Sequence, residues 1–370
     1  MDQHFDTVII GAGPAGMGCG ITLQKDHHNV CVIDKAVFPR NKTCAGLVTG
    51  KTYRLIKELF DGEEFDSLFC CTADTVKLYR KTELLASAPI KNSARLVNRI
   101  EFDNALVERY KALGGIILEG ERNIVIDYEN HCVILSNGDH IGFQNIIFAD
   151  GALSLSHHLL KFDKMEMAFG IEAYVPSEQF NTDSVDLYFD CIDDGYLWVF
   201  PHGETVCIGV ANMYNKEIDY KKILTDFLED IGVDPNKQHY TGAFLPYGYV
   251  IPQEKLPKNV ILVGDAGGFT DPISGEGLFM ALKTGMLAAE ALADTDPKAA
   301  YLNSVKPIAS IVKEGKKVQK IFFSSAVQKV FLKKVIGKNG LVGFFYDNMV
   351  DEYNYDYKNI RKMYGDYKQK

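Results

Sequence analysis

The chain has 370 residues, 46% of them hydrophobic and 24% charged, with a formal net charge of −9. A single core stops growing at ~250–300 residues, so two domains are expected. The acidic balance argues against nucleic acid as a partner. Eight cysteines without Cys-x-x-Cys spacing argue against a metal site and for a reducing, cytoplasmic location. The start lacks the features of a signal peptide, and no stretch reaches the ~18 apolar residues of a membrane span.

The first predicted elements are a strand over residues 5–10 and a helix over 15–25, joined by a glycine-rich turn. Gly11 permits the tight turn, Gly13 lets the backbone approach a pyrophosphate, and Gly16 allows close packing of helix and strand. Asp34 ends a second apolar strand, where a carboxylate accepts hydrogen bonds from ribose hydroxyls. This order predicts a dinucleotide site, to which Pro14, Ala15 and Lys35 are also assigned.

Further elements follow from apolar periodicity. Helices are expected over 51–60, 99–113 and 278–292, and strands over 116–118, 124–126, 133–135, 146–148 and 259–263, with a turn at Asn137-Gly138. Residues 167–248 alternate strand-like runs with turns and are expected to form a separate antiparallel sheet beside the cofactor. The remainder, from about residue 297, is expected to form a helical tail.

A second glycine-rich segment, residues 264–277, follows the predicted strand over 259–263. Asp265 is placed to accept hydrogen bonds from a ribityl chain. Gly264 starts the turn, and Gly275 and Gly277 open the next helix, whose amides suit the negative charge of a reduced flavin. Taken alone, this segment also fits an ordinary strand-loop-helix in which glycine allows tight packing. Together with the first segment, it predicts that the dinucleotide is FAD.

Several stretches resemble one known family when they are taken together. They are GDAGGFTDPISGEG at 264–277, PRNKTCAG at 39–46, YLWVFP at 196–201, RIEFD at 99–103 and ADG at 149–151. In them the chain is similar to the geranylgeranyl reductases, a branch of the p-hydroxybenzoate hydroxylase-like flavoproteins, from the start to about residue 300. The resemblance adds Cys44, Ala45, Gly46, Arg99, Asp150, Pro272 and Glu276 to the expected FAD contacts. Ala45 replaces a usual glycine and Asp34 replaces the commoner Glu, which leaves the substrate open.

The expected fold class is α/β, or α+β overall: a Rossmann-like FAD-binding domain with a three-layer ββα core, an antiparallel-sheet substrate domain and a helical C-terminal tail. The FAD-binding domain is discontinuous, and the expected division of the chain is 1–70, 90–160 and 255–296 for that domain, 71–89 and 161–254 for the substrate domain, and 297–370 for the tail.

The resemblance implies an FAD-dependent oxidoreductase that reduces carbon-carbon double bonds of a polyprenyl, geranylgeranyl-type lipid by hydride transfer. An isolated alkene accepts hydride poorly, so an acid must supply the proton. Cys44 and Tyr196 are the candidates, although Cys44 fits a packing role equally well, and Trp198 is grouped with them as catalytic. The alternatives are a flavin-dependent monooxygenase or halogenase acting on an aromatic substrate, and a non-catalytic flavin-binding redox protein. No second Gly-x-Gly-x-x-Gly follows a strand, so NAD(P)H at the flavin face, a ferredoxin or a quinol remain as electron donors.

The aromatic segment is the predicted substrate wall. Tyr196, Trp198 and Phe200 share one face of a strand, and Gly195 and Pro201 bracket the run. Such a face suits a prenyl chain, whose binding comes from buried CH₂ groups at ~0.8 kcal/mol each. The competing interpretation is that the three rings simply fill the core. Pro201 is included among the expected substrate contacts.

Residues 313–338 carry eight lysines against one acid, Glu314, with aromatic and aliphatic residues interleaved. This composition fits a basic amphipathic element that rests on an anionic leaflet and admits a lipid, which would place the protein peripherally at the inner face of the membrane. The alternative is that the aromatic face packs on the protein and the lysines are solvated. The adjacent thiols Cys70 and Cys71 are expected to be ordinary reduced cysteines.

Overall fold

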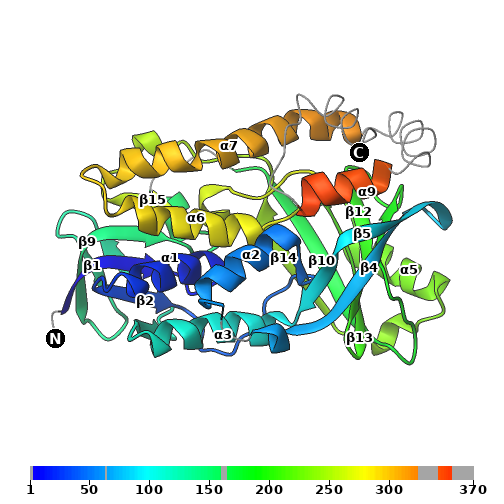
Figure 1. The fold of residues 1–370 in the computed structure, drawn as a ribbon, viewed down its shortest axis with the longest axis horizontal. Helices are drawn as coiled ribbons and strands as arrows, with labels where there is room; N and C mark the ends of the chain where they lie inside the picture. Colours follow the sequence, from blue (N-terminus) through cyan, green and yellow to red (C-terminus); the bar gives the residue numbers. More distant parts are fainter. Residues whose placement is uncertain (1–2, 63–64, 160–164, 324–340, 352–370) are drawn as a thin grey trace.

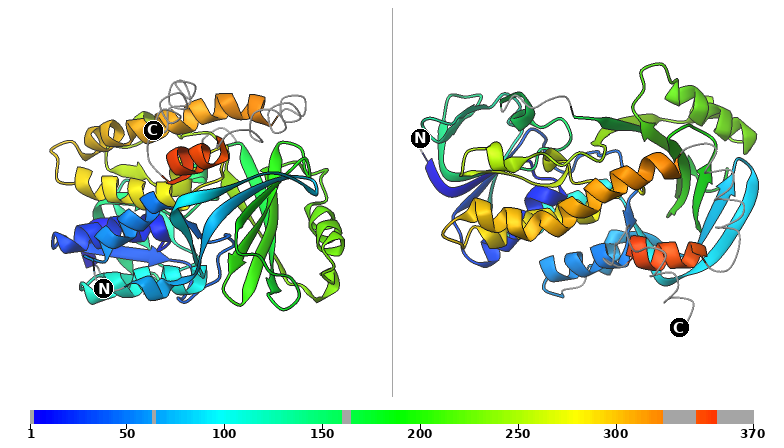
Figure 2. Two further views of the ribbon diagram at one scale, coloured as in Figure 1. Left: turned by 45° about the vertical axis from the view of Figure 1, so that its right-hand side comes forward. Right: turned by 90° about the horizontal axis from the view of Figure 1, so that it is seen from above.

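The computed structural model describes residues 3–62, 65–159, 165–323 and 341–351. Two β-sheets lie next to each other along the long axis of the molecule, with helices stacked over the first sheet (Figure 1). The two further views show the same division into two halves (Figure 2). The predicted α/β class, with an FAD-binding type of fold and a second sheet, is confirmed.

The first sheet has the strand order β6-β2-β1-β9-β8-β7, and β15 also pairs with β9. Its strands are β1 (Gln3–Ile10), β2 (Val30–Asp34), β6 (Ile116–Glu119), β7 (Val125–Asp127), β8 (Cys132–Ile134), β9 (His140–Phe148) and β15 (Val260–Leu262). The pairs that link β6, β2, β1, β9 and β15 are parallel, whereas β7, β8 and β9 form an antiparallel meander. The parallel strands are apolar runs because both faces of the sheet are covered.

Helices α1 (Pro14–Lys25), α2 (Gly50–Leu59), α3 (Arg99–Ala112), α4 (Leu155–Leu159), α6 (Leu278–Ala291) and α7 (Pro297–Phe322) belong to this half. Two close approaches of these helices depend on glycine. A Cβ on Gly16 would lie 1.8 Å from the Gly11 carbonyl oxygen, and one on Gly285 would lie 2.1 Å from that of Ala15. Gly16 therefore lets α1 leave β1 sharply, and Gly285 lets α6 press against α1.

The second sheet has the strand order β14-β10-β13-β12-β11-β4-β5-β3. Its strands are β3 (Leu47–Val48), β4 (Phe69–Arg80), β5 (Glu83–Val97), β10 (Met167–Pro176), β11 (Val185–Phe189), β12 (Gly195–His202), β13 (Thr205–Met213) and β14 (Tyr240–Pro246). All pairs are antiparallel except β11 with β4, which run parallel. Helix α5 (Tyr220–Asp230) covers one face through a core that includes Leu197, Val199 and Leu224. The other face is turned toward a cavity.

The predicted boundaries near residues 70 and 90 fall inside β4 and β5. Both strands belong to the second sheet along their full length, and the short β3 joins the same sheet. Neither β4 nor β5 is a continuous apolar run, so cross-strand pairing stabilises them in the sheet. The division of the chain into two domains therefore stays a prediction, and strands β4 and β5 cross its predicted boundaries.

The predicted basic segment at 313–338 is described only to residue 323, so 324–338 lie outside the described residues. In the described portion, Phe323 is buried, Val318 and Phe322 pack against the hydrophobic core, and Lys316 pairs with Glu166 at 2.6 Å. The apolar face here packs on the protein, which was the alternative interpretation. Helix α9 (Leu341–Phe345) and a π-helical turn (Tyr346–Asp351) follow, and no helix in the described ranges has the length and apolarity to cross a membrane.

Candidate functional site

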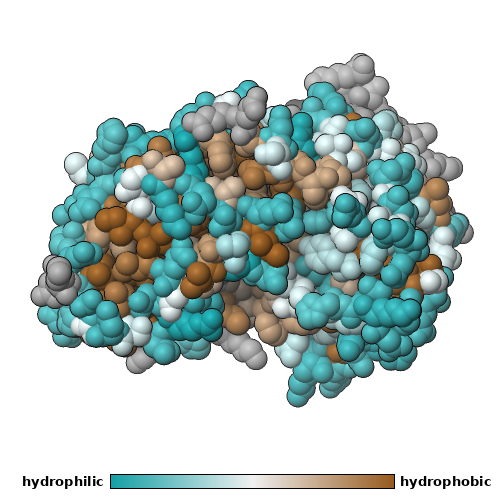
Figure 3. Space-filling view, turned by 90° about the horizontal axis from the view of Figure 1, so that it is seen from below, coloured by the Kyte–Doolittle hydropathy of each residue, from teal (hydrophilic) through white to brown (hydrophobic). Residues whose placement is uncertain are grey.

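A cavity of about 1340 Å³ lies between the two sheets and is lined by both. Seen from below, the surface is hollowed between the two halves, and apolar side chains show in the hollow (Figure 3). The glycine turn before α1 lies at one end, the loop around Cys44 and the segment around Asp265 lie in the middle, and apolar side chains of the second sheet and α9 line the rest.

The first end is shaped by backbone. Gly11 has a φ of +105°, and a Cβ there would lie 2.5 Å from the Ala149 carbonyl oxygen. Gly13 is the N-cap of α1, no side chain caps it, and Pro14 occupies the first turn. The free amides and the positive end of the helix therefore face the cavity, which is the arrangement that binds phosphate. Asp34 closes this end, with its two carboxylate oxygens accepting from Ala12 N–H at 2.6 Å and Ala36 N–H at 2.7 Å.

The second glycine segment lies opposite. Gly264 has a φ of +54° and Gly275 one of +70°, so both need the left-handed region. The Asp265 carboxylate accepts a hydrogen bond from Thr270 Oγ1 at 2.9 Å, and burial raises its pKa while nearby Lys42 opposes the shift. Helix α6 begins after Gly277 without a side-chain cap. A second set of free helix amides thus faces the cavity.

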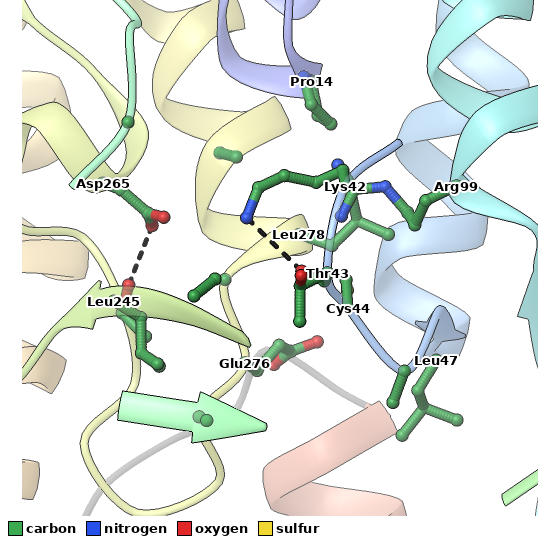
Figure 4. A pocket seen from close by; sticks show the side chains of 18 of the residues that line it. Pro14, Lys42, Thr43, Cys44, Leu47, Arg99, Leu245, Asp265, Glu276 and Leu278 are labelled. Atoms are coloured by element: carbon green, nitrogen blue, oxygen red, sulfur yellow. Dashed lines mark hydrogen bonds between the residues drawn. The ribbon is translucent and has the colours of Figure 1, made fainter. Parts of the chain in front are cut away.

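The Cys44 loop is fixed by a buried ion pair. Arg99 donates two hydrogen bonds to Asp103, at 2.8 and 2.9 Å, and Arg40 lies 3.3 Å from the same carboxylate. Burial lowers the pKa of Arg99, but the Asp103 carboxylate and the nearby Cys44 thiol outweigh this effect and raise it. Figure 4 shows Lys42 reaching across the cavity from this loop, with Arg99 behind it and Asp265 on the facing segment. Positive charge from the loop therefore faces the acids of the second glycine segment.

The aromatic strand β12 turns Tyr196, Trp198 and Phe200 toward the cavity. The Tyr196 hydroxyl donates to the Ser274 carbonyl at 2.5 Å, which ties the second sheet to the glycine segment, and burial raises its pKa above the ordinary value. The Trp198 indole N–H donates to Cys207 Sγ at 3.5 Å. A Cβ on Gly209 would lie 2.2 Å from the indole ring, so the absence of a side chain there makes room for Trp198.

Sequence comparison connects this geometry with known proteins. The profile of the pyridine nucleotide-disulphide oxidoreductases matches residues 5–180. An uncharacterized protein of Methanosarcina barkeri is 30% identical over 356 residues, which are 95% of this chain and 86% of that protein. A menaquinone reductase of Mycobacterium tuberculosis is 26% identical over 330 residues (80% and 78%). A geranylgeranyl diphosphate reductase of Rhodobacter capsulatus is 28% identical over 323 residues (82% and 78%).

The chain belongs to the geranylgeranyl reductase family of FAD-dependent oxidoreductases. A geranylgeranyl bacteriochlorophyll reductase-like protein of Thermoplasma acidophilum shares the fold, with a TM-score of 0.71 at 16% identity over 94% of this chain and 100% of that one. The expected family, the oxidoreductase class and FAD as cofactor are thereby confirmed.

The residues that line the cavity of this chain fit FAD. Asp150 Oδ1 is buried and has no hydrogen-bond partner among the described residues, while Oδ2 accepts from Leu155 N–H at 2.7 Å. A buried oxygen of this kind costs free energy unless a ligand or water satisfies it. Two further features favour a bound FAD: the uncapped N-termini of α1 and α6, and the glycines that allow the backbone to approach a ligand closely. Bound here, FAD supplies two-electron hydride chemistry.

The structure brings most of the sequence-predicted site residues to this cavity, and their roles stay predictions. Those that line it are Gly11, Gly13, Pro14, Ala15, Asp34, Lys35, Cys44, Ala45, Gly46, Arg99, Asp150, Tyr196, Trp198, Phe200, Asp265, Gly275, Glu276 and Gly277. Gly16, Pro201, Gly264 and Pro272 are not among the lining residues. The Glu276 carboxylate is already engaged, since it lies 2.5 Å from Lys51 Nζ and accepts from Thr49 Oγ1 at 3.0 Å.

Lys42 and Glu172 line the cavity and were not among the predicted site residues. Lys42 was visible in the sequence as the lysine of the PRNKTCAG loop. Glu172 is an acid inside the apolar run of β10, at a position that faces the cavity with Gly170. A charged residue on the inward face of an apolar strand is a signal that the sequence contained.

Proposed function

We propose that this protein saturates carbon-carbon double bonds of a polyprenyl lipid while FAD is bound in the cavity. The observation that carries the proposal is an apolar chamber continuous with the flavin end. It is lined by Val76, Leu78, Val185, Leu187, Phe189, Phe322, Val342, Phe344 and Val350, together with the aromatic residues of β12. A chain of isoprene units binds in such a chamber through buried CH₂ and CH₃ groups, at ~0.8 kcal/mol for each buried CH₂.

The two named relatives support this substrate class. One is called a menaquinone reductase and the other a geranylgeranyl diphosphate reductase. Menaquinone and geranylgeranyl diphosphate differ in their head groups, and both carry a polyprenyl chain. The chamber of this protein suits that shared part.

The chain's own residues have distinct roles in the proposal. The amides around Gly13 and at the start of α6 hold the pyrophosphate and the flavin ring, and Asp34 and Asp265 bind the ribose and ribityl hydroxyls. Tyr196, Trp198 and Phe200 form the wall against which the prenyl chain lies. The loop of Cys44 closes the middle of the cavity, where proton delivery must occur.

An anaerobic experiment tests the proposal. The purified holoprotein is reduced, a geranylgeranylated lipid is added, and the flavin absorbance and the product mass are followed together. Flavin reoxidation with a product heavier by two mass units per double bond is expected. No reoxidation by lipid, together with oxygen-dependent reoxidation that hydroxylates or halogenates an added aromatic substrate, would establish the monooxygenase or halogenase alternative. NADPH, NADH, a reduced ferredoxin and a quinol, tried in turn as reductants, identify the class of electron donor.

A chamber variant sharpens the test. Leu187→Trp places a larger side chain in the chamber, so turnover of a geranylgeranyl lipid should fall about ten-fold or more, while a geranyl analogue is less affected. Leu84→Trp is the matched control, since Leu84 lies on the same sheet and is exposed. Equal turnover of long and short chains by Leu187→Trp would show that the prenyl chain does not occupy this chamber.

A further inference from the structure

The side chain of Glu172 lies in the cavity wall near the middle of β10. Only 1% of the residue is exposed, and it lines the cavity. In the sheet it stands opposite Gly209 on β13, whose missing side chain makes room for the Trp198 indole ring. It is therefore a carboxyl group held inside the protein and open only to the chamber.

The partners of Glu172 are largely uncharged. Oε1 accepts from the Cys44 backbone N–H at 2.8 Å, and Oε2 accepts from the Cys207 thiol at 3.7 Å. Cys207 in turn accepts from the Trp198 indole N–H, and the Tyr174 hydroxyl donates to the Cys44 carbonyl at 3.1 Å. The carboxyl group thus joins the loop at the flavin end to the aromatic wall of the chamber.

This environment favours a protonated carboxyl group. Burial raises the pKa of Glu172 from 4.5 to about 7, against smaller opposing effects of the Cys44 amide, the Cys207 thiol, Lys42 and Arg99. Burial also raises the pKa of Tyr174 and Cys207, so both remain neutral near it. A carboxyl group with a pKa near the working pH is well suited to give up a proton and regain it.

We propose that Glu172 is the proton donor of the reduction, and that the Cys44 amide and the Cys207 thiol position its carboxyl group toward the bound double bond. This inference rests on the proposed function. Tyr196 is a weaker acid for the same step, because its hydroxyl already donates to Ser274 and burial raises its pKa. Cys44 contributes its backbone N–H to the site whether or not its thiol reacts.

The step balances. Saturation of one double bond forms two carbon-hydrogen bonds, one from a hydride with two electrons, which is the flavin chemistry stated above, and one from a proton. The O–H bond of Glu172 breaks, and the π-electron pair of the alkene forms the new C–H bond to that proton. The carboxylate then regains a proton from water, and a two-electron donor of the classes named above restores the reductant.

The first test uses Glu172→Gln, which keeps the size and one oxygen that can accept from the Cys44 N–H, but has no acidic proton to donate. The variant should bind FAD and be reduced like the unaltered protein, while saturated product forms about 10²-fold more slowly. Asp186→Asn is the matched control: Asp186 is also a buried carboxyl with a raised pKa on the second sheet, but Ser184 holds it and it does not line the cavity. Turnover of Glu172→Gln within about three-fold of the unaltered protein would overturn the inference.

The second test requires neither turnover nor flavin. Infrared difference spectra of the apoprotein, taken as the pH is raised, should contain a protonated-carboxyl band that disappears with a midpoint near 7. Glu172→Gln should remove that band and Asp186→Asn should retain it. A spectrum in which no band near that midpoint depends on Glu172 would contradict the proposal.

The two proposals fail separately. If the unaltered protein does not saturate any prenyl lipid, the proposed function is wrong. If it does, and Glu172→Gln does so equally well, only the role of Glu172 is wrong. Glu172→Asp, which keeps an acid with a shorter side chain, should recover part of the lost rate, and no recovery together with an unchanged pH profile would indicate a structural role.

Discussion

Gly11 has a φ of +105°, and a side chain there would meet the Ala149 carbonyl oxygen at 2.5 Å. We expect Gly11→Ala to lose FAD, because the turn must open at the point where the pyrophosphate would lie. The absorbance ratio of flavin to protein after purification measures this. Gly62→Ala is the control, with a φ of +74° and nothing within 4 Å of its Cβ; it should cost only ~1–2 kcal/mol of stability and keep FAD. Equal flavin loss by both variants would rule out the steric explanation.

The raised pKa of Glu172 also makes stability depend on pH. With a pKa of about 7 in the folded protein against an ordinary 4.5, the folded state binds the extra proton. Its stabilising contribution is full below pH 4.5 and is lost as the pH rises through 7. The free energy of unfolding of Glu172→Gln minus that of the unaltered protein should therefore be larger at pH 8 than at pH 4.5. The increase should be up to about 3 kcal/mol. Urea unfolding at both pH values measures the difference, and a constant difference would contradict the shift.

The sequence indicated some of these residues and not others, for a physical reason. Asp34 and Asp265 follow apolar strands beside glycine turns, so local order predicted where they lie. The position of Glu172 depends on Cys44, which is 128 residues away, and on Cys207, which is 35 away. Contacts at such separations leave no local pattern beyond an acid in an apolar strand.

At the scale of elements, a buried ion pair ties α2 to the loop before α6. Lys51 is 2% exposed and lies 2.5 Å from Glu276, and Thr49 caps α2 while donating to the same carboxylate. Lys51→Met should destabilise the protein by ~3–5 kcal/mol because it leaves a buried acid without its cation, whereas Lys51→Met with Glu276→Gln should cost less. Denaturant unfolding of the three variants measures the coupling. A double variant no more stable than Lys51→Met would show that the pair is not coupled.

The boundaries of helices with strong apolar periodicity were predicted to within a residue or two, whereas the pairing of β4 with β5 was not predicted. The helix expected over 99–113 is observed as Arg99–Ala112, with Asn98 as its N-cap. Strands β4 and β5 mix polar and apolar residues and contain three register irregularities, so their pattern of alternation is broken. Their place in the second sheet follows from partners elsewhere in the chain.

At the scale of the whole molecule, the cavity is lined by both sheets, so a ligand there contacts both. Added FAD should protect amides of β10 and β12 as well as those of β1 in hydrogen exchange. It should also raise stability by about 2.7 kcal/mol at a hundred-fold excess over its Kd. Protection confined to the first sheet would show that the cofactor does not bridge the halves.

The cofactor end of the cavity also has a consequence for synthesis. The glycine turn at 11–16 and Asp34 leave the ribosome early, whereas Asp265 and the start of α6 follow more than two hundred residues later. At ~5–20 residues per second, this interval lasts roughly ten to fifty seconds. During that time β1, β2 and β9 can pair, but β15 and the second set of helix amides are still missing. FAD therefore binds late in synthesis, after most of the chain has left the ribosome. Cells short of flavin would accumulate apoprotein in which both sheets have formed but the cavity holds no cofactor.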